Sequence, residues 1–167
     1  MKHFILPLFL IFTFSSFSQT RKKANKDTRN WRYEIEGVGQ GSMGTYLVKS
    51  WQYSKKPRIA LEQTKKNAVH GIIFKGYPSS KGVIGQPPLA RNPILDEQQK
   101  SFFDQFFGKN GRYMQFVSLT TDGTILPGDR IKIGREYKVG VVVSVQVAAL
   151  RKYLESAGVI KGLSNGF

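Results

Sequence analysis

Few residues of this sequence are suited to acid–base or nucleophilic chemistry. The chain has no cysteine and only two histidines, His3 and His70, so thiol nucleophiles and Cys-based zinc sites are excluded. His70 would have to serve as the general base, but it follows Val69 inside an expected helix and no G-x-S-x-G motif accompanies it. A small hydrolase of unrecognised type, with His70 and Asp104 as its candidates, remains an alternative to the non-enzymatic protein that we expect.

The glycine-rich segment from Gly39 to Gly44 matches the pattern G-x-G-x-x-G. A dinucleotide-binding site needs a helix directly after these glycines, because the helix amino terminus holds the pyrophosphate. Here the residues that follow are typical of a strand, so the segment is interpreted as a hairpin turn, with a ligand-contacting loop as the alternative. We expect no cofactor. We also expect no metal site, since His70 has no neighbouring ligand residue and the carboxylates lack calcium-loop spacing.

Basic residues are the most prominent charged feature. Lys and Arg outnumber Asp and Glu by 26 to 11, which gives a formal net charge of +15. Two groups of cations are the candidate partner- or anion-binding residues, namely Lys55, Lys56, Arg58, Lys65 and Lys66 near an expected helix, and Arg130, Lys132, Arg135 and Lys138 near the last expected strands. If the polar faces that carry Lys132 and Lys138 adjoin, they form a cationic patch for phosphate or carboxylate. A solvated outer sheet face is the alternative.

Nucleic acid is not expected as a partner. Binding of single strands combines cations with exposed aromatic rings, and Trp31, Trp51 and Tyr53 are expected to be needed in the core.

The start of the chain also points away from the cytosol. Residues 1–18 have a short basic start, an apolar run over 4–14 and small residues at Ser16 and Ser18, which is typical of a secretory signal peptide. An 11-residue apolar helix spans only about 16 Å, which is too short to cross a bilayer, so this run is not expected to remain as a membrane anchor. We expect no membrane span in the mature chain.

Several elements must position these residues. Residues 19–30 are expected to be a disordered basic linker, and residues 31–167 a single domain. Alternation predicts strands over 31–36 and 45–53, joined as a hairpin around a turn at 37–44. A helix is expected from Pro57 to about Gly76, with Ser54 as its candidate cap and a close packing contact at Gly71.

The second half begins with a long Pro- and Gly-containing connection over 76–95, in which Val83, Ile84 and Leu89 are expected to dock on the body. A capping box at Asp96 should start a helix that buries phenylalanines. Strands are expected over 113–120 and around Ile131 and Ile133. Alternating apolar residues then predict a long strand, with a closing helix that stops at Gly158. The apolar face of that strand comprises Tyr137, Val139, Val141, Val143, Val145 and Val147.

This order predicts an α+β fold, a twisted and mostly antiparallel sheet with helices packed on one face. The run Ile59-Ala-Leu-Glu-Gln-Thr-Lys-Lys-Asn-Ala-Val-His-Gly-Ile-Ile-Phe-Lys-Gly76, after a strand hairpin, resembles the helix of small Gram-negative envelope domains. Examples are Lpp-type lipoproteins and the amino-terminal domain of flagellar assembly protein T. The chain departs from them by lacking a lipobox cysteine and by inserting a loop and a Phe-rich helix.

The whole chain also resembles small exported Bacteroidota proteins of unknown function, and the Phe-Ser-Gln ending of the apparent signal resembles signals of that group. Neither resemblance supplies catalytic residues. Together with the charge, they imply a periplasmic or extracellular, non-enzymatic envelope protein that binds or helps to assemble another envelope protein or an anionic surface. Its expected contact elements are the 76–95 loop, the 37–44 turn and the basic sheet face. A binder of anionic polymers such as lipopolysaccharide, acidic glycan or extracellular nucleic acid is the alternative binding function.

Overall fold

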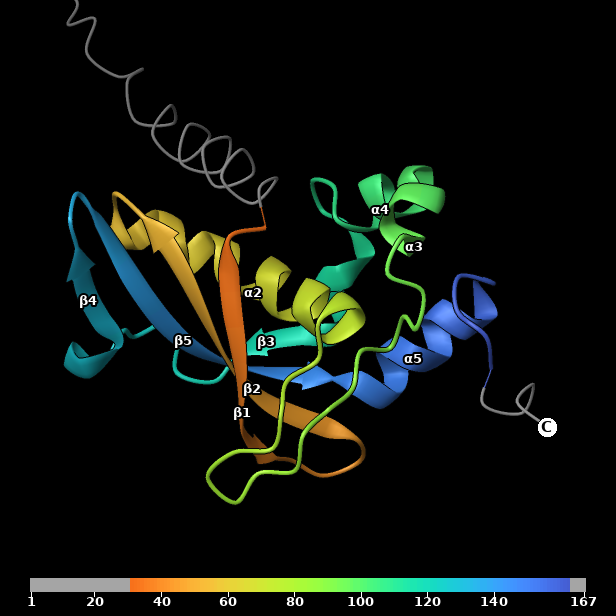
Figure 1. The fold of residues 1–167 in the computed structure, drawn as a ribbon, viewed down its shortest axis with the longest axis horizontal. Helices are drawn as coiled ribbons and strands as arrows, with labels where there is room; N and C mark the ends of the chain where they lie inside the picture. The colour runs from red at the N-terminus through yellow and green to blue at the C-terminus, as the bar shows by residue number, and fades with distance from the viewer. Residues whose placement is uncertain (1–30, 163–167) are drawn as a thin grey trace, which may run out of the picture.

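The computed structural model describes residues 31–162, apart from the side chain of Glu62 (Figure 1). The predicted signal peptide, the predicted linker and residues 163–167 lie outside this range. The strands are β1 (Tyr33–Gln40), β2 (Thr45–Ser54), β3 (Val117–Leu119), β4 (Arg130–Ile133) and β5 (Glu136–Gln146). The helices are α2 (Pro57–Phe74), α3 (Leu95–Gln98), α4 (Lys100–Phe106) and α5 (Val147–Ser156), with short 3-10 turns at Arg112–Phe116 and Pro127–Asp129.

The strands of the described range form one antiparallel sheet around β5. β2 pairs with β5 along its whole length and with β1 on its other side. β3 and β4 share the opposite edge of β5, where β4 pairs with the first residues of β5 and β3 with the last. Figure 1 shows β4 at one end of the molecule and α5 at the other. The α+β class and the antiparallel sheet predicted from the sequence are confirmed.

The long alternating strand is the element that the sequence predicted best. Side chains in β5 alternate between the two faces, and Val139, Val141, Val143 and Val145 are all at most 2% exposed. Val147 is buried too, but it is the first residue of α5 rather than part of the strand. This valine face lies under α2, so burial of apolar surface holds the helix against the sheet.

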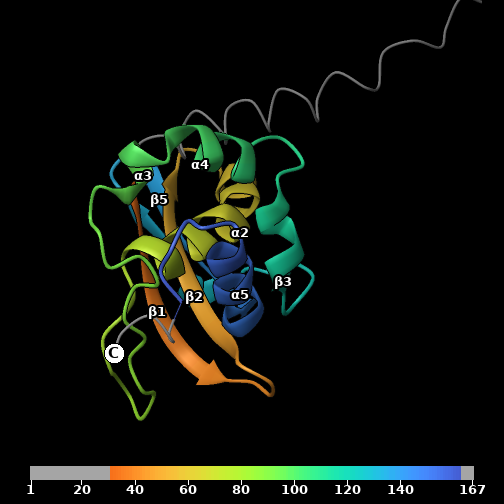
Figure 2. The same ribbon diagram turned by 90° about the vertical axis from the view of Figure 1, so that its right-hand side faces the viewer.

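Helix α2 is buried on several sides, which explains why its apolar residues do not form a simple stripe. Ile72 and Ile73 are fully buried, while α4 lies above α2 in both views (Figures 1 and 2). A Cβ on Gly71 would come within 2.7 Å of the Ile35 side chain, so the close contact expected at this glycine is confirmed. Pro57 occupies the first helical turn as predicted, but Lys56 and not Ser54 is the N-cap residue.

Two expectations for the middle of the chain are wrong. Asp96 does not cap a helix, because it lies within the short helix α3, and a break at Gln99 separates α3 from α4. The first half of the segment 113–120 is a 3-10 turn, and its strand β3 covers only Val117–Leu119. In both places the chain must bend to bring phenylalanines into the core, and this tertiary packing overrides the local pattern. Those buried phenylalanines are Phe103, Phe106, Phe107 and Phe116.

The connection between α2 and α3 is long and folds back on itself. Tyr77 and Gln86 exchange two backbone hydrogen bonds across it. Leu89 is buried and Val83 packs against the core as expected, but Ile84 is 69% exposed at the tip, so its predicted docking is wrong. Among the helices of residues 31–162, none combines the length and the hydropathy that a bilayer crossing requires.

Candidate functional site

The two basic groups of the sequence meet at one end of the sheet. Ser54, the last residue of β2, pairs with Tyr137, and Tyr137 pairs with Lys132 of β4. β5 lies between β2 and β4, and neighbouring strands lie about 5 Å apart, so the end of β2 and the β4–β5 turn are at the same end of the sheet, about two strand spacings apart (Figure 1). Lys55 and Lys56 directly follow Ser54 at this end. We call this surface the basic end; it comprises Lys55, Lys56, Arg58, Arg130, Lys132 and Arg135.

Most cations of the basic end have no acidic partner in the described part of the chain. No described carboxylate lies within 4.0 Å of the side-chain nitrogens of Lys55, Lys56, Lys132 or Arg135. All four residues are exposed. The Arg130 guanidinium lies 4.6 Å from the centre of the Tyr137 ring, a cation–π contact that holds it beside Lys132. The basic end therefore offers several uncompensated positive charges to an anionic group.

The other predicted cations lie elsewhere. Antiparallel partners share a face of the sheet, and Lys132 pairs with Tyr137 whereas Lys138 pairs with Ile131 and Tyr53. Lys132 and Lys138 therefore lie on opposite faces and do not form the single patch that was considered. Lys65 is half-buried further along α2, and Lys66 lines a separate pocket.

The outer face of the sheet is a network of ion pairs rather than a free basic surface. Lys138 Nζ lies 2.7 Å from Glu34 Oε2, and the Tyr53 hydroxyl donates to Glu34 Oε1 at 2.8 Å. The hydrogen bond from Lys138 makes the largest contribution to holding the pKa of Glu34 below its usual value, and the bond from Tyr53 adds to it. The bond between Lys138 and Glu34 also raises the pKa of Lys138. The face carries two further ion pairs, Arg32–Glu136 and Lys49–Asp129.

Trp51 and Tyr53 lie on this outer face, which corrects the expectation that they belong to the core, whereas Trp31 packs against the core as expected. Trp51 and Tyr53 are half-buried, and the Trp51 ring lies over Gly140, where a Cβ would come within 2.8 Å of it. Lys138 Nζ is 5.4 Å from the centre of the Trp51 ring and 5.6 Å from that of Tyr53. The rings are thus already covered by the protein's own cations, which leaves little free aromatic surface for stacked bases.

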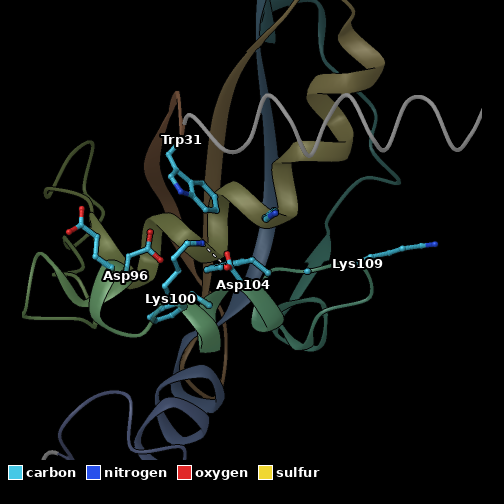
Figure 3. A pocket seen from close by; sticks show the side chains of 10 residues that line it. Trp31, Asp96, Lys100, Asp104 and Lys109 are labelled. Atoms are coloured by element: carbon cyan, nitrogen blue, oxygen red, sulfur yellow. Dashed lines mark hydrogen bonds and ion pairs between the residues drawn. The ribbon is translucent and has the colours of Figure 1, made fainter.

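A pocket opens between the start of β1 and helices α3 and α4 (Figure 3). Its volume is about 750 Å³, within the range of small-molecule sites. Three aromatic side chains, Trp31, Phe103 and Phe107, form its apolar lining. Its charged lining residues are Lys66, Asp96, Glu97, Lys100, Asp104 and Lys109.

The acidic and basic residues that line the pocket are equal in number. Lys100 Nζ lies 2.6 Å from Asp104 Oδ2, whereas Lys109 points away from the other labelled residues (Figure 3). Burial raises the pKa of Asp96, and the nearby Asp104 and Glu97 add to this while Lys100 opposes it. With equal numbers of acidic and basic lining residues, the pocket does not select strongly for either sign of charge.

His70 lies behind this pocket and is sealed from it. Its ring stacks on Trp31 with 3.4 Å between ring centroids, and its Nδ1 is hydrogen-bonded to the Tyr33 hydroxyl. His70 is only 5% exposed. Burial, with smaller contributions from Lys75 and Lys66, lowers its pKa to about 2. The ring is therefore neutral and acts as a support for Trp31, whereas Asp104, the other hydrolase candidate, is exposed on α4.

Sequence reasoning missed a buried polar seam between α2 and the sheet. Gln52 projects from the inner face of β2, accepts a hydrogen bond from Ser50 and donates one to the Thr64 hydroxyl. Asn67, one turn of α2 further on, is 2% exposed, and its side-chain oxygen has no hydrogen-bond partner among the described residues. Hydrogen bonding avoids the large penalty of burying a polar group, so the bond between Gln52 and Thr64 helps to fix how α2 sits on the sheet. The alternation of β2 could have revealed it, since its inward positions after Val48 are Ser50, Gln52 and Ser54.

The hairpin turn that was predicted as a contact element is only partly available to a partner. The hairpin turn is shorter than expected, because β1 continues to Gln40, and Met43 at its tip is 96% exposed. The turn touches α5, where the Ala148 N–H donates to the Gly44 carbonyl at 3.2 Å.

The side chains that the structure describes contain no cluster of three or more Asp, Glu or His residues that is suited to a metal ion.

Comparison with protein-family models, curated proteins and solved structures finds no match for this chain.

Proposed function

We propose that this chain is an exported, non-enzymatic protein of the cell envelope that holds an anionic polymer at its basic end. The observation that carries the proposal is the convergence of two sequence-distant cation groups. Lys55 and Lys56 lie at the same end of the sheet as Lys132 and Arg135, with β5 between the two groups, and no described carboxylate forms an ion pair with them. Phosphate and carboxylate groups are the complementary ligands.

The contrast with the outer sheet face supports this assignment. Three cations there, Arg32, Lys49 and Lys138, are each held by a carboxylate within 2.7 Å. Clustered unpaired cations repel one another and contribute nothing to packing at exposed positions, so a ligand is a physical reason for them to be left open. The buried, neutral state of His70 favours binding over hydrolysis for the residues considered.

The test is binding of the full chain to an inorganic polyphosphate chain over a range of salt concentrations. Counterion release makes the affinity fall steeply and log-linearly with salt. The variant Lys55→Gln/Lys56→Gln/Lys132→Gln/Arg135→Gln is expected to bind about tenfold more weakly or worse, with a shallower salt dependence.

The matched control, Lys81→Gln/Arg91→Gln/Lys152→Gln/Lys161→Gln, removes the same charge at exposed positions outside the basic end. It should keep most of the affinity. If the control loses as much as the first variant, net charge and not the basic end explains binding. An affinity that does not change with salt would also contradict the proposal.

A further inference from the structure

Strand β4 carries unusual apolar exposure beside the basic end. All four of its residues are exposed, and Ile131 and Ile133 are each 46% exposed. Leu126, just before the 3-10 turn that leads into β4, is 60% exposed. β4 pairs only with β5, so its other edge has no partner strand in residues 31–162. Clustered exposed apolar residues mark an interaction site more often than scattered ones do.

The apolar and basic residues are arranged on the same projecting hairpin. Ile131 and Ile133 share the outer face of the sheet, whereas Arg130 and Lys132 project from the opposite face. The turn that follows contains Gly134, at φ 58°, and Arg135. Approached end-on, the hairpin therefore presents isoleucine on one side and cations on the other. The start of α2, which follows Lys55 and Lys56, lies at the same end of the molecule (Figure 1).

The combination of exposed isoleucines and cations on one hairpin discriminates between classes of anionic partner. A soluble polyanion would satisfy the cations but leave the isoleucines in water. An anionic bilayer surface offers both phosphates and apolar depth, and each Lys or Arg near such a surface raises affinity about fivefold. Lys and Arg side chains can also extend along the interface to reach phosphates while neighbouring apolar groups enter it.

We propose that the β4–β5 hairpin docks on an anionic lipid bilayer. Ile131 and Ile133 enter the headgroup region, and Lys55, Lys56, Lys132 and Arg135 meet lipid phosphates. This inference rests on the proposed anion-binding function of the basic end and adds an anionic lipid surface as a partner of the same cations. It requires no change of fold, since every residue involved is already exposed.

The test measures co-sedimentation of the full chain with vesicles of phosphatidylglycerol mixed with phosphatidylcholine, and with vesicles of phosphatidylcholine alone. Binding is expected only to the anionic vesicles. The variant Ile131→Ser/Ile133→Ser should bind them about tenfold more weakly, while its affinity for polyphosphate stays unchanged. The matched control Met43→Ser/Ile84→Ser removes two exposed apolar side chains from other loops and should bind vesicles like the unmodified chain.

Each other outcome is decisive. If the chain binds polyphosphate but not anionic vesicles, lipid docking is wrong and the proposed function stands. If it binds neither, both are wrong. Full vesicle affinity in the Ile131→Ser/Ile133→Ser variant, or an equal loss in the control, would overturn the role of the hairpin. Circular dichroism checks that both variants are folded.

Discussion

Replacing Gly76 with alanine is expected to lower the free energy of unfolding by about 3 kcal/mol or more. Gly76 follows Lys75, the C-cap residue of α2, and has φ 62°, a left-handed conformation that disfavours side chains. An added Cβ would lie 2.3 Å from the Gln86 carbonyl oxygen and 2.8 Å from the Pro88 nitrogen. Both are backbone atoms that cannot rotate away, so the loop must shift. Urea unfolding followed by circular dichroism measures the change.

Gly82 provides the matched control, because it lies in the same loop with φ 79° and has nothing within 4 Å of an added Cβ. Gly82→Ala should therefore cost only the left-handed conformation, about 1 kcal/mol. The difference of about 2 kcal/mol between the variants isolates the backbone contact. Equal losses would show that conformation alone accounts for the effect, and that the loop base is not tightly packed.

The expected size of the effect follows from what the loop does for α2. A helix ends with carbonyl groups that have no partner within the helix. Here the Leu89 and Ala90 amides of the returning loop donate to the Ile72 and Ile73 carbonyls at 3.1 and 2.9 Å. Displacing the loop at Gly76 would strain these hydrogen bonds. The glycines and prolines of the sequence predicted a loop, but only the structure distinguishes the crowded glycine from the open one.

The elements that the sequence predicted well are those with a strong local signal. Strict alternation identified β5, and Pro57 located the start of α2, because both features reflect constraints within a few residues. The break at Gln99 and the shortened β3 were missed for the opposite reason. They are set by where Phe103, Phe106 and Phe116 must pack, and this depends on residues distant in sequence.

The same distinction applies to the candidate site. The sequence identified all six residues of the basic end but could not separate them from Lys138, since the pairing of Lys138 with Glu34 spans 104 residues. Strand register, which no local pattern encodes, decides that Lys132 and Lys138 lie on opposite faces. The sealed environment of His70 likewise arises from Trp31 and Tyr33, which lie on a different element.

His70 leads to the second large effect, a loss of stability in mild acid. Because burial lowers its pKa from 6.5 to about 2, the folded state binds no proton at this site while the unfolded chain does so below about pH 6.5. The unfolded state therefore gains protons first, and stability falls as the pH drops from 6.5 toward 2. Between about pH 7.5 and pH 5, His70 alone should remove about 2 kcal/mol from the free energy of unfolding.

The surroundings of the ring support this direction. Trp31 stacks on it, Phe74 and Phe107 lie 4.6 and 5.6 Å away by ring centroids, and the Tyr33 hydroxyl already occupies its Nδ1 through a hydrogen bond. The charged groups that act on it are Lys75 and Lys66, which both disfavour protonation. No carboxylate among the side chains that the structure describes forms an ion pair with it.

The variant His70→Asn separates this effect from the general titration of carboxylates. Asparagine keeps an acceptor for Tyr33 but does not titrate, so the variant should be less stable than the unmodified chain at neutral pH yet lose about 2 kcal/mol less between about pH 7.5 and pH 5. Urea unfolding of both proteins at the two pH values gives the comparison. Parallel losses, or an NMR titration of the folded-state imidazole near pH 6.5, would show that the ring is accessible to protons and that Trp31 does not seal it.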